Sequence, residues 1–290
     1  MKKYKIETAQ NIIFSYFDSS PLKVFSTREL QQIFREHRTK WNISASMFFH
    51  SFLIFLLKSG QLRRHSFKSE RQVRALFSWN EVTLYQLAAV LFNKAYFSHF
   101  SAMEIHGLTD QMLKTVYLNI EQTRKGLPSS ELLQENIDRA FSNQPRTSSS
   151  VFSYDPYRIT RLNGKNTGRL GVTEVDWAGQ PNLPVTNLER TLIDIVVRPV
   201  YSGGIHEVLK AYQAAREKVQ INRLMAYLKE LSYIYPYHQA IGFYLQRAGY
   251  PESGYNRLKE FGLKYDFYLD YNVLDKTYLP EWRLFVPKGF

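Results

Sequence analysis

The sequence predicts an α+β protein made of a small amino-terminal module, residues 1–80, and a larger mixed α/β region, residues 81–290. Three observations support this organisation. Three helical patterns followed by two alternating strands fill the first 80 residues. Helical and strand-like segments then mix irregularly along the rest of the chain. The 290-residue length and the 44% of hydrophobic residues suit two domains, each with its own core.

Two helices are expected at the start of the module. Apolar residues at helical spacing, from Ile6 to Phe17, predict the first. Ser26 followed three residues later by Glu29 is a capping box, in which each side chain accepts a hydrogen bond from the other residue's backbone N–H. The second helix is therefore expected to begin there, with Leu30 in its buried stripe.

A third helix is expected at about residues 45–59. Asn42 and Ser44 are competing candidates for its N-cap, and Gly60 suits the position after its end. Its apolar residues lie on too many sides for one stripe, so we expect it to be buried on two fronts. Small and polar residues gather at its start, as expected for a helix whose first turn enters a DNA groove. That stretch contains Ser44, Ser46, Met47, His50 and Ser51.

Residues 62–67 and 73–79 predict a two-stranded hairpin, joined by the polar connection "KSERQ". Three helices followed by a hairpin is the order of a winged helix-turn-helix, in which the third helix reads DNA and the hairpin is the wing. The basic residues of the wing would contact phosphates: Arg63, Arg64, Lys68, Arg71 and Arg74. The alternative is a solvated sheet edge whose charges discourage strand pairing.

The charge distribution favours a nucleic-acid partner for the module. The formal net charge is +12, and residues 1–80 contain 14 Lys and Arg against 5 Asp and Glu. The module therefore has a net charge of +9, and residues 81–290 have only +3. We interpret this asymmetry as a basic module joined to a nearly neutral body.

The larger region begins with a helical pattern at Thr83. A short helix ending near Gly107, strands in "TVYLNIEQ", "VFSYDPYRITRLNGK" and "GVTEVDWAG", and a loop at residues 142–150 are expected next. Thr186 and Glu189 form a second capping box, which predicts a helix that ends at Arg198-Pro199. Three further helices are expected at about 204–217, 221–232 and 236–248, and strands near the carboxy terminus.

The sequence shows no catalytic or metal motif. Glu174 with Asp176, and Asp266 with Asp270, are acidic pairs, but no nuclease, nucleotidyltransferase or phosphate-loop pattern accompanies them. His99 and His106 are too far apart on a helix for one tetrahedral ion. We therefore expect no cofactor, no metal and no enzyme activity.

The composition of the chain also indicates the cellular compartment of the protein. The chain has no cysteine, which excludes disulfides and thiolate chemistry. Its longest apolar runs, such as Phe52 to Leu57, have six residues, against the roughly 18 of a membrane span. The amino terminus lacks the apolar segment of a signal peptide. These features predict a cytoplasmic protein without a membrane partner.

Several segments in order resemble the AbiEi family, the antitoxin and transcriptional-regulator half of AbiE abortive-infection toxin–antitoxin systems. They are "GQLRR", "YFSHFSAMEIHGLTDQ" and "LPVTNLERTLIDIVVRPVYSGGIHEVLKAY", of which "VTNLERTLID" with "RPxxxGG" is the most specific. The amino-terminal helices resemble the family by architecture more than by sequence, and residues after about 250 have no counterpart in the pattern.

The resemblance implies an autorepressor that binds inverted repeats in its own promoter and takes part in phage defence. It also implies a nucleotidyltransferase-like toxin encoded nearby, countered without a stable complex, and is compatible with a monomer that binds DNA cooperatively. Carried over, Arg63 and Arg64 lie in the wing, with Lys40 and Ser46 near the recognition helix. Glu189, Arg190 and Asp194 fall in the signature helix, with either an antitoxin role or a scaffolding one.

A second class of function stays open at this point. The carboxy-terminal region could be an enzyme or a protein-interaction module that the winged helix targets to nucleic acid. Substitution of Glu174 and Asp176 separates the two classes, because it would abolish such an activity without changing the affinity for DNA.

Overall fold

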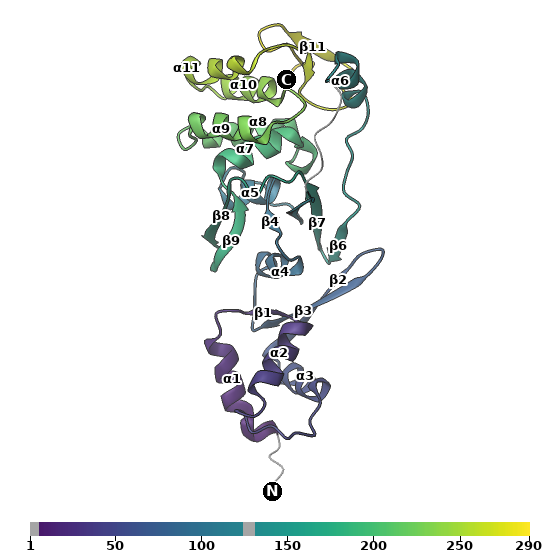
Figure 1. Cartoon of the computed structure of the whole chain (residues 1–290), viewed down its shortest axis with the longest axis vertical. Coiled ribbons are helices and arrows are strands. Elements are labelled where there is room, and N and C mark those ends of the chain that lie inside the picture. The colour runs from purple at the N-terminus through teal and green to yellow at the C-terminus, as the bar shows by residue number, and fades with distance from the viewer. Residues whose placement is uncertain (1–5, 124–130) are drawn as a thin grey trace. The chain divides into compact units, whose positions relative to one another are not determined.

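A computed structural model of the chain describes residues 6–123 and 131–290. The chain forms two compact units (Figure 1). The first contains the described residues up to Lys94 together with Val151–Ile159, and the second contains Ala95–Ser150 and Thr160–Phe290. Both units combine helices with sheet strands, which confirms the α+β class. The first unit extends beyond residues 1–80, because a helix after the hairpin and a strand from much later in the chain join it.

The first unit contains the helices and the hairpin that the sequence predicts for the amino-terminal module. Its elements are η1 (Ile6–Ala9), α1 (Gln10–Ser19), β1 (Val24–Ser26), α2 (Thr27–His37), α3 (Phe49–Lys58), β2 (Leu62–Lys68), β3 (Val73–Trp79), α4 (Leu84–Leu91) and β6 (Val151–Tyr154). The first expected helix is divided into the 3₁₀ turn η1 and the helix α1. The capping box of Ser26 and Glu29 is present at the start of α2, with the Ser26 N–H donating to Glu29 Oε2 over 2.6 Å.

The core of the first unit is aromatic. Phe17 of α1 stacks on Trp79 of β3 with ring centroids 4.8 Å apart, and Phe52 of α3 lies 5.8 Å from Trp41. Phe17, Phe52 and Trp79 are fully buried. Rings of this size bury roughly 150–250 Å² each and dominate the energetics of a small core. The three helices are therefore fixed against one face of the β2–β3 hairpin.

The strands of the first unit follow the order β1-β3-β2-β6. β2 and β3 are antiparallel, with Leu62 opposite Trp79 and Lys68 opposite Val73. Their connection is tight: the Ser69 N–H donates to the Gln72 carbonyl over 2.9 Å. β6 adds to the outer edge of β2 through Lys68 and Ser153. The outer edge of β2 is therefore paired with β6 over part of its length.

The third helix begins later than the sequence predicts. Helix α3 starts at Phe49, and its N-cap is Phe48 in an extended conformation, so neither Asn42 nor Ser44 is the cap. Residues before it form turns in which the Ser44 hydroxyl accepts a hydrogen bond from the Ser46 N–H over 3.3 Å. A serine side chain that bonds to nearby backbone competes with helix formation. Gly60 does follow the end of α3, with a φ of +77°.

The second unit contains the remaining elements. They are β4 (Tyr96–Phe97), α5 (Phe100–Ile105), β5 (Thr115–Glu121), α6 (Gln134–Phe141), β7 (Tyr157–Gly164), β8 (Val172–Trp177), β9 (Gln180–Thr186), α7 (Leu188–Val197), η2 (Pro199–Tyr201), α8 (Ile205–Ala215), α9 (Ile221–Leu231), α10 (Tyr237–Arg247), α11 (Glu252–Tyr255), η3 (Asn256–Phe261), β10 (Phe267–Tyr268), β11 (Lys276–Leu279) and β12 (Leu284–Pro287). β7 begins in the first unit and ends in the second.

Two sheets and a helical layer build the second unit. The strands follow the order β7-β5-β4-β9-β8, and a small separate sheet has the order β10-β12-β11. Helices α8, α9 and α10 pack around α7 (Figure 1). All eight residues from Glu189 to Val196 are buried. Helix α7 is therefore the central element of this unit.

Close packing also fixes the carboxy-terminal segment. Gly242 of α10 lies so near the ring of Trp282 that a Cβ atom would be 2.1 Å from it. The buried amide of Gln239, one turn earlier, donates to the carbonyl of Trp282 over 2.7 Å. Several residues after about 250 are thus part of the core, among them Phe267, Trp282 and Leu284. Among the described residues, no helix combines the length and the apolar character needed to cross a bilayer.

Candidate nucleic-acid interface

The β2–β3 hairpin has two distinct faces. Side chains alternate across a strand, and residues directly opposite each other in an antiparallel pair share a face. Leu62 and Trp79 point into the core beneath the helices, so their face is the helix-facing side. The pairs Arg64–Phe77, Ser66–Ala75 and Lys68–Val73 follow on this same side. The other side holds the pairs Arg63–Ser78, His65–Leu76 and Phe67–Arg74.

The helix-facing side of the hairpin carries exposed basic residues. Arg64 and Lys68 are exposed, and Val73 opposite Lys68 is 60% exposed. Arg71 is exposed in the turn between the strands. Three of the five basic residues predicted for the wing therefore lie on the side of α3 or at the tip.

The other two predicted wing residues have partners within the first unit. The Arg63 Nη1 atom lies 2.9 Å from Glu81 Oε1, in an ion pair at the surface. Arg74 is half-buried: its Nη1 donates to the Leu91 carbonyl over 3.0 Å, and its guanidinium lies 5.1 Å from the centre of the Phe92 ring. Arg74 is thus held against the end of α4.

The side of the hairpin that faces away from the helices contains a polar contact that the sequence does not predict. His65 Nδ1 lies 2.7 Å from the Tyr154 hydroxyl, and Nε2 lies 2.8 Å from Ser78 Oγ. Burial, together with the charge of Arg63, lowers the pKa of His65. The imidazole is therefore neutral at pH 7, and it fastens β2 to the strand β6.

Helix α3 presents an exposed stripe beside its buried one. Phe52 and Leu56 are fully buried, whereas His50, Ile54 and Lys58 are exposed and follow each other at four-residue intervals. Residues four apart lie on one side of a helix. Phe48, at the N-cap, is 80% exposed. One stripe of α3 is thus in the core and another is accessible from its first turn to its last.

The remaining predicted contacts lie just before α3. Lys40 is exposed in the turn after α2, and Met47 is partly exposed. The Ser44 and Ser46 hydroxyls lie 2.8 Å apart, and Arg38 Nη2 donates to the Ser44 carbonyl over 2.8 Å. Ser44, Ser46 and Met47 therefore precede the helix rather than form its first turn, and His50 is the predicted residue that α3 itself carries.

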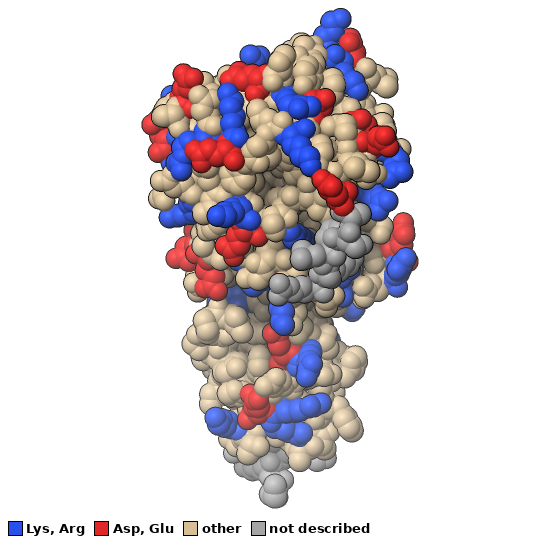
Figure 2. All heavy atoms as spheres, turned by 45° about the horizontal axis from the view of Figure 1, so that its top comes forward, with Lys and Arg blue, Asp and Glu red and all other residues tan. Residues whose placement is uncertain are grey.

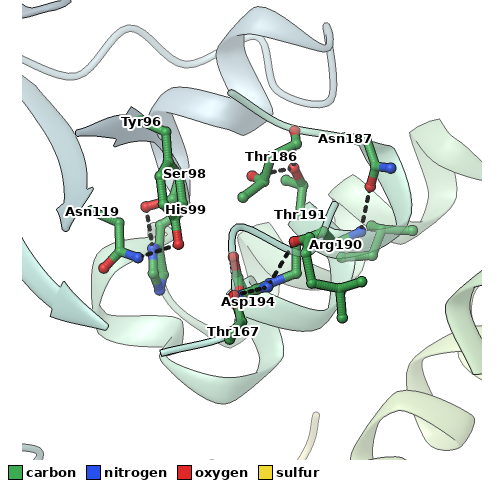
Figure 3. Close-up of polar contacts among 12 residues, drawn as sticks. Tyr96, Ser98, His99, Asn119, Thr167, Thr186, Asn187, Arg190, Thr191 and Asp194 are labelled. Carbon is green, nitrogen blue, oxygen red and sulfur yellow. Dashed lines mark hydrogen bonds and ion pairs between the residues drawn. The ribbon is translucent and has the colours of Figure 1, made fainter. Parts of the chain in front are cut away.

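Two of the predicted signature residues, Arg190 and Asp194, form a buried charged pair on α7. Arg190 Nε lies 2.8 Å from Asp194 Oδ1 (Figure 3). Arg190 Nη1 also donates to the Leu170 carbonyl over 2.9 Å. Both side chains are less than 10% exposed. Burial opposes the charge of Arg190, but the Asp194 carboxylate raises its pKa. A charge at this depth is tolerated only when it is paired and hydrogen-bonded.

Glu121 extends these contacts toward the strands. Its carboxylate accepts hydrogen bonds from the Thr167 hydroxyl and from the Arg169 N–H at 3.1 Å. The Tyr96 hydroxyl donates to Glu121 over 3.3 Å. Burial alone would raise the pKa of Glu121, but the hydrogen bonds from Thr167 and Arg169 and the charge of Arg190 lower it. The carboxylate is thus ionised and holds the segment between β7 and β8 in place.

Glu189 does not cap α7 but links it to another helix. Its carboxylate accepts a hydrogen bond from the Gln220 N–H over 2.9 Å and lies 3.5 Å from Arg223. The N-cap of α7 is Asn187, whose side chain accepts from the Arg190 N–H over 3.1 Å. The predicted capping box with Thr186 is therefore wrong, because the helix begins one residue later. Glu189 instead joins α7 to the start of α9.

The two histidines considered for metal binding have separate partners. His99 is buried beside Ser98, with Nδ1 2.9 Å from the hydroxyl, and His106 Nε2 lies 2.6 Å from the Thr186 carbonyl. Burial, with help from the charges of Arg198 and Arg190, lowers the pKa of His99 to about 3. In the part of the chain that the structure describes, no three His, Asp or Glu side chains are grouped to hold a metal ion.

The acidic pairs are accounted for by local structure. Glu174 is exposed on β8, and Asp176 accepts a hydrogen bond from the Asn182 N–H over 3.0 Å within the β8–β9 hairpin. Asp266 Oδ1 lies 2.8 Å from Arg283 Nε, and Asp270 accepts from the Tyr271 N–H over 2.8 Å. On the face shown in Figure 2, acidic and basic side chains are interspersed over the larger unit.

The fold and the sites define an α+β protein in which a small basic unit of helices and a hairpin accompanies a larger unit built around one buried, charged helix. Among solved structures, the crystal structure of the RV2827C protein from Mycobacterium tuberculosis is similar, with a TM-score of 0.58 at 15% sequence identity. The match covers 97% of this chain and 92% of that one. At this identity the likeness shows a shared fold. No protein-family model matches the chain, and no curated protein sequence matches it.

Proposed function

We propose that this chain is a DNA-binding transcriptional regulator whose first unit acts as a winged helix-turn-helix. In this proposal α3 is the recognition helix and the β2–β3 hairpin is the wing. The observation that carries the proposal is the placement of Arg64 and Lys68 on the same side of the hairpin as α3. Exposed lysine and arginine at that position suit the phosphates on either side of a groove that a helix enters.

The accessible stripe of α3 supports the proposal. His50 is at the start of the helix, where the recognition helix of such domains contacts base edges. Lys58 is at the far end of the same stripe, and Lys40 is exposed in the turn before the helix. In this arrangement, contacts between the first turn of α3 and the bases would read the DNA sequence. Contacts between the flanking lysines and the phosphates would fix the position of the protein on the duplex.

The test compares binding of the full chain to the DNA upstream of its own gene and to a scrambled duplex, from low to physiological salt. We expect the native duplex to be preferred by about a thousandfold. Arg64→Ala should lower the slope of log affinity against log salt by about one, because one phosphate contact is lost. Arg63→Ala is the matched control: it removes a neighbouring arginine from the opposite face, and the slope should not change.

Two outcomes would contradict the proposal. Equal affinity for both duplexes would exclude specific recognition. An equal effect of Arg63→Ala and Arg64→Ala would contradict the assignment of the phosphate contact to the helix-facing side, because Arg63 lies on the other side of the hairpin. His50→Ala adds a test of base recognition, because it should cost about 1–3 kcal/mol on the native duplex and much less on the scrambled one.

On the resemblance to the AbiEi family, we further propose that the regulator represses its own operon and acts as the antitoxin to a nucleotidyltransferase-like toxin encoded beside it. The experiment is co-expression of the neighbouring gene with this chain in a host that the toxin arrests. Restored growth supports the antitoxin role, and unrelieved arrest excludes it. Arg64→Ala should weaken repression of a reporter and leave rescue of growth unchanged if the two activities belong to different units.

A further inference from the structure

The second unit contains a cavity of about 830 Å³ beside the carboxyl end of the buried helix α7. Helix α6 and the segment after it form one wall, and the Arg198–Val200 turn forms another. The cavity lies wholly within the second unit, so its chemistry is separate from that of the proposed DNA interface. A volume of this size is in the range that accommodates a small-molecule ligand.

Three arginines line this cavity: Arg139, Arg146 and Arg198. None of the described residues that line it is acidic. Each guanidinium group is positively charged, so three positive charges line one hollow, and none of the described lining residues supplies a carboxylate to balance them. Such an arrangement attracts anions and disfavours cations.

The arginines differ in how they are held. Arg139 Nη2 donates to Asn136 Oδ1 over 2.9 Å, and Asn136 also lines the cavity. The guanidinium of Arg198 lies 6.0 Å from the centre of the Tyr201 ring. All three arginines are exposed, so a ligand can reach them from solution.

The other lining groups suit a ligand with polar and aromatic parts. Asn143 and Gln144 supply amide donors and acceptors. Tyr271 and Tyr235 also line the cavity and are fixed against Phe141, with ring centroids 4.3 Å and 5.5 Å from it. Rings held in this way can stack on a planar group without a further loss of side-chain freedom.

We propose that this cavity binds a phosphorylated small molecule, with the phosphates held by the three arginines. Arginine binds phosphate through paired N–H donors, and several arginines together accommodate the charge of a di- or triphosphate. The same phosphate chemistry occurs in nucleotides and in inorganic polyphosphate. The two tyrosines would favour a nucleotide, because only the nucleotide offers a base to stack.

The experiment measures binding of ATP and of inorganic triphosphate to the full chain by calorimetry at low and physiological salt. We expect ATP to bind, and the double variant R139A/R146A to weaken binding by at least about tenfold, because charged hydrogen bonds are lost. R198K keeps the charge and removes the fork of donors, so it should weaken binding less than R198A. Arg216→Ala is the matched control, because it removes an exposed arginine of the same unit that does not line the cavity.

The two ligands distinguish the sources of phosphate. Much tighter binding of ATP assigns the site to nucleotides, and equal binding assigns it to polyphosphate. No binding of either ligand at millimolar concentration would overturn the proposal, as would an equal loss in the Arg216→Ala control. The salt slope of DNA binding should be the same in R139A/R146A as in the unchanged chain. A reduced slope without ATP binding would make these arginines DNA contacts and would also overturn the proposal.

Discussion

The two units differ in where their charged side chains lie. In the first unit the described core is built from aromatic and aliphatic side chains, and the basic residues lie outside it on the hairpin and around α3. In the second unit charged side chains enter the core: Glu189, Arg190, Asp194 and Glu207 are all buried. A surface charge is free to meet a partner, whereas a buried charge must already have one. The same residue types are therefore candidates for function in one unit and for architecture in the other.

Helix α7 shows what the buried charges do. Arg190 joins the helix to the Leu170 carbonyl and Glu189 joins it to the start of α9. Glu207 of α8 similarly accepts a hydrogen bond from Gln111 over 2.9 Å. Each contact links segments distant in the sequence. The most specific part of the resemblance to the AbiEi family thus coincides with the residues that organise the second unit.

The largest effect is expected from breaking the buried pair on α7. Asp194→Ala leaves the Arg190 guanidinium buried without its carboxylate, which should lower the free energy of unfolding by about 3–5 kcal/mol. Urea unfolding measures the change. Arg216→Ala, which removes one member of an exposed pair with Glu217, should cost no more than about 1 kcal/mol. Similar values for both variants would show that α7 does not depend on its buried charges.

An effect of intermediate size is expected from pH. His99 has a folded-state pKa of about 3 against 6.5 in the unfolded chain. Between these values the unfolded state binds the extra proton, so the contribution of His99 is present above pH 6.5 and is lost as the pH falls toward 3. From pH 7 to pH 5 the loss is about 2 kcal/mol.

The measurement is urea unfolding of the unchanged chain and of His99→Asn at both pH values. Asparagine tolerates the positive φ of 53° at this position and does not titrate. The difference in free energy of unfolding between the two proteins should shift by about 2 kcal/mol in favour of the variant at pH 5. An unchanged difference would mean that the imidazole is accessible to protons in the folded state.

The smallest effect is expected at the surface of the first unit. Ser26→Ala removes the side chain that caps α2, where Ser26 Oγ accepts from the Glu29 N–H over 3.2 Å. The loss should be about 1 kcal/mol. Thermal unfolding measures it, with Ser19→Ala at the exposed end of α1 as the control. If the two substitutions cost the same, the capping box does not contribute to the stability of α2.

Local patterns account for what the sequence predicted well. The capping box at Ser26, the end of α3 at Gly60 and the β2–β3 hairpin are all present. In the second unit the expected helices α8, α9 and α10 are found within two residues of the predicted bounds. These features depend on neighbours along the chain. By contrast β9, with two prolines, and the short helix α6 were not predicted, because their own residues give weak signals and their neighbours in the fold stabilise them.

The sequence by itself determined the α+β class, the basic amino-terminal module and most helix positions, since these follow from periodicity, capping and composition. Only the tertiary structure decided which charges are available. It placed Arg64 and Lys68 on the helix-facing side of the hairpin, and it tied Arg74 to α4. It also brought Arg139 and Arg198, 59 residues apart, to one cavity. The reason is physical: whether a charge is paired, buried or exposed depends on groups that are distant in the sequence and adjacent in the fold.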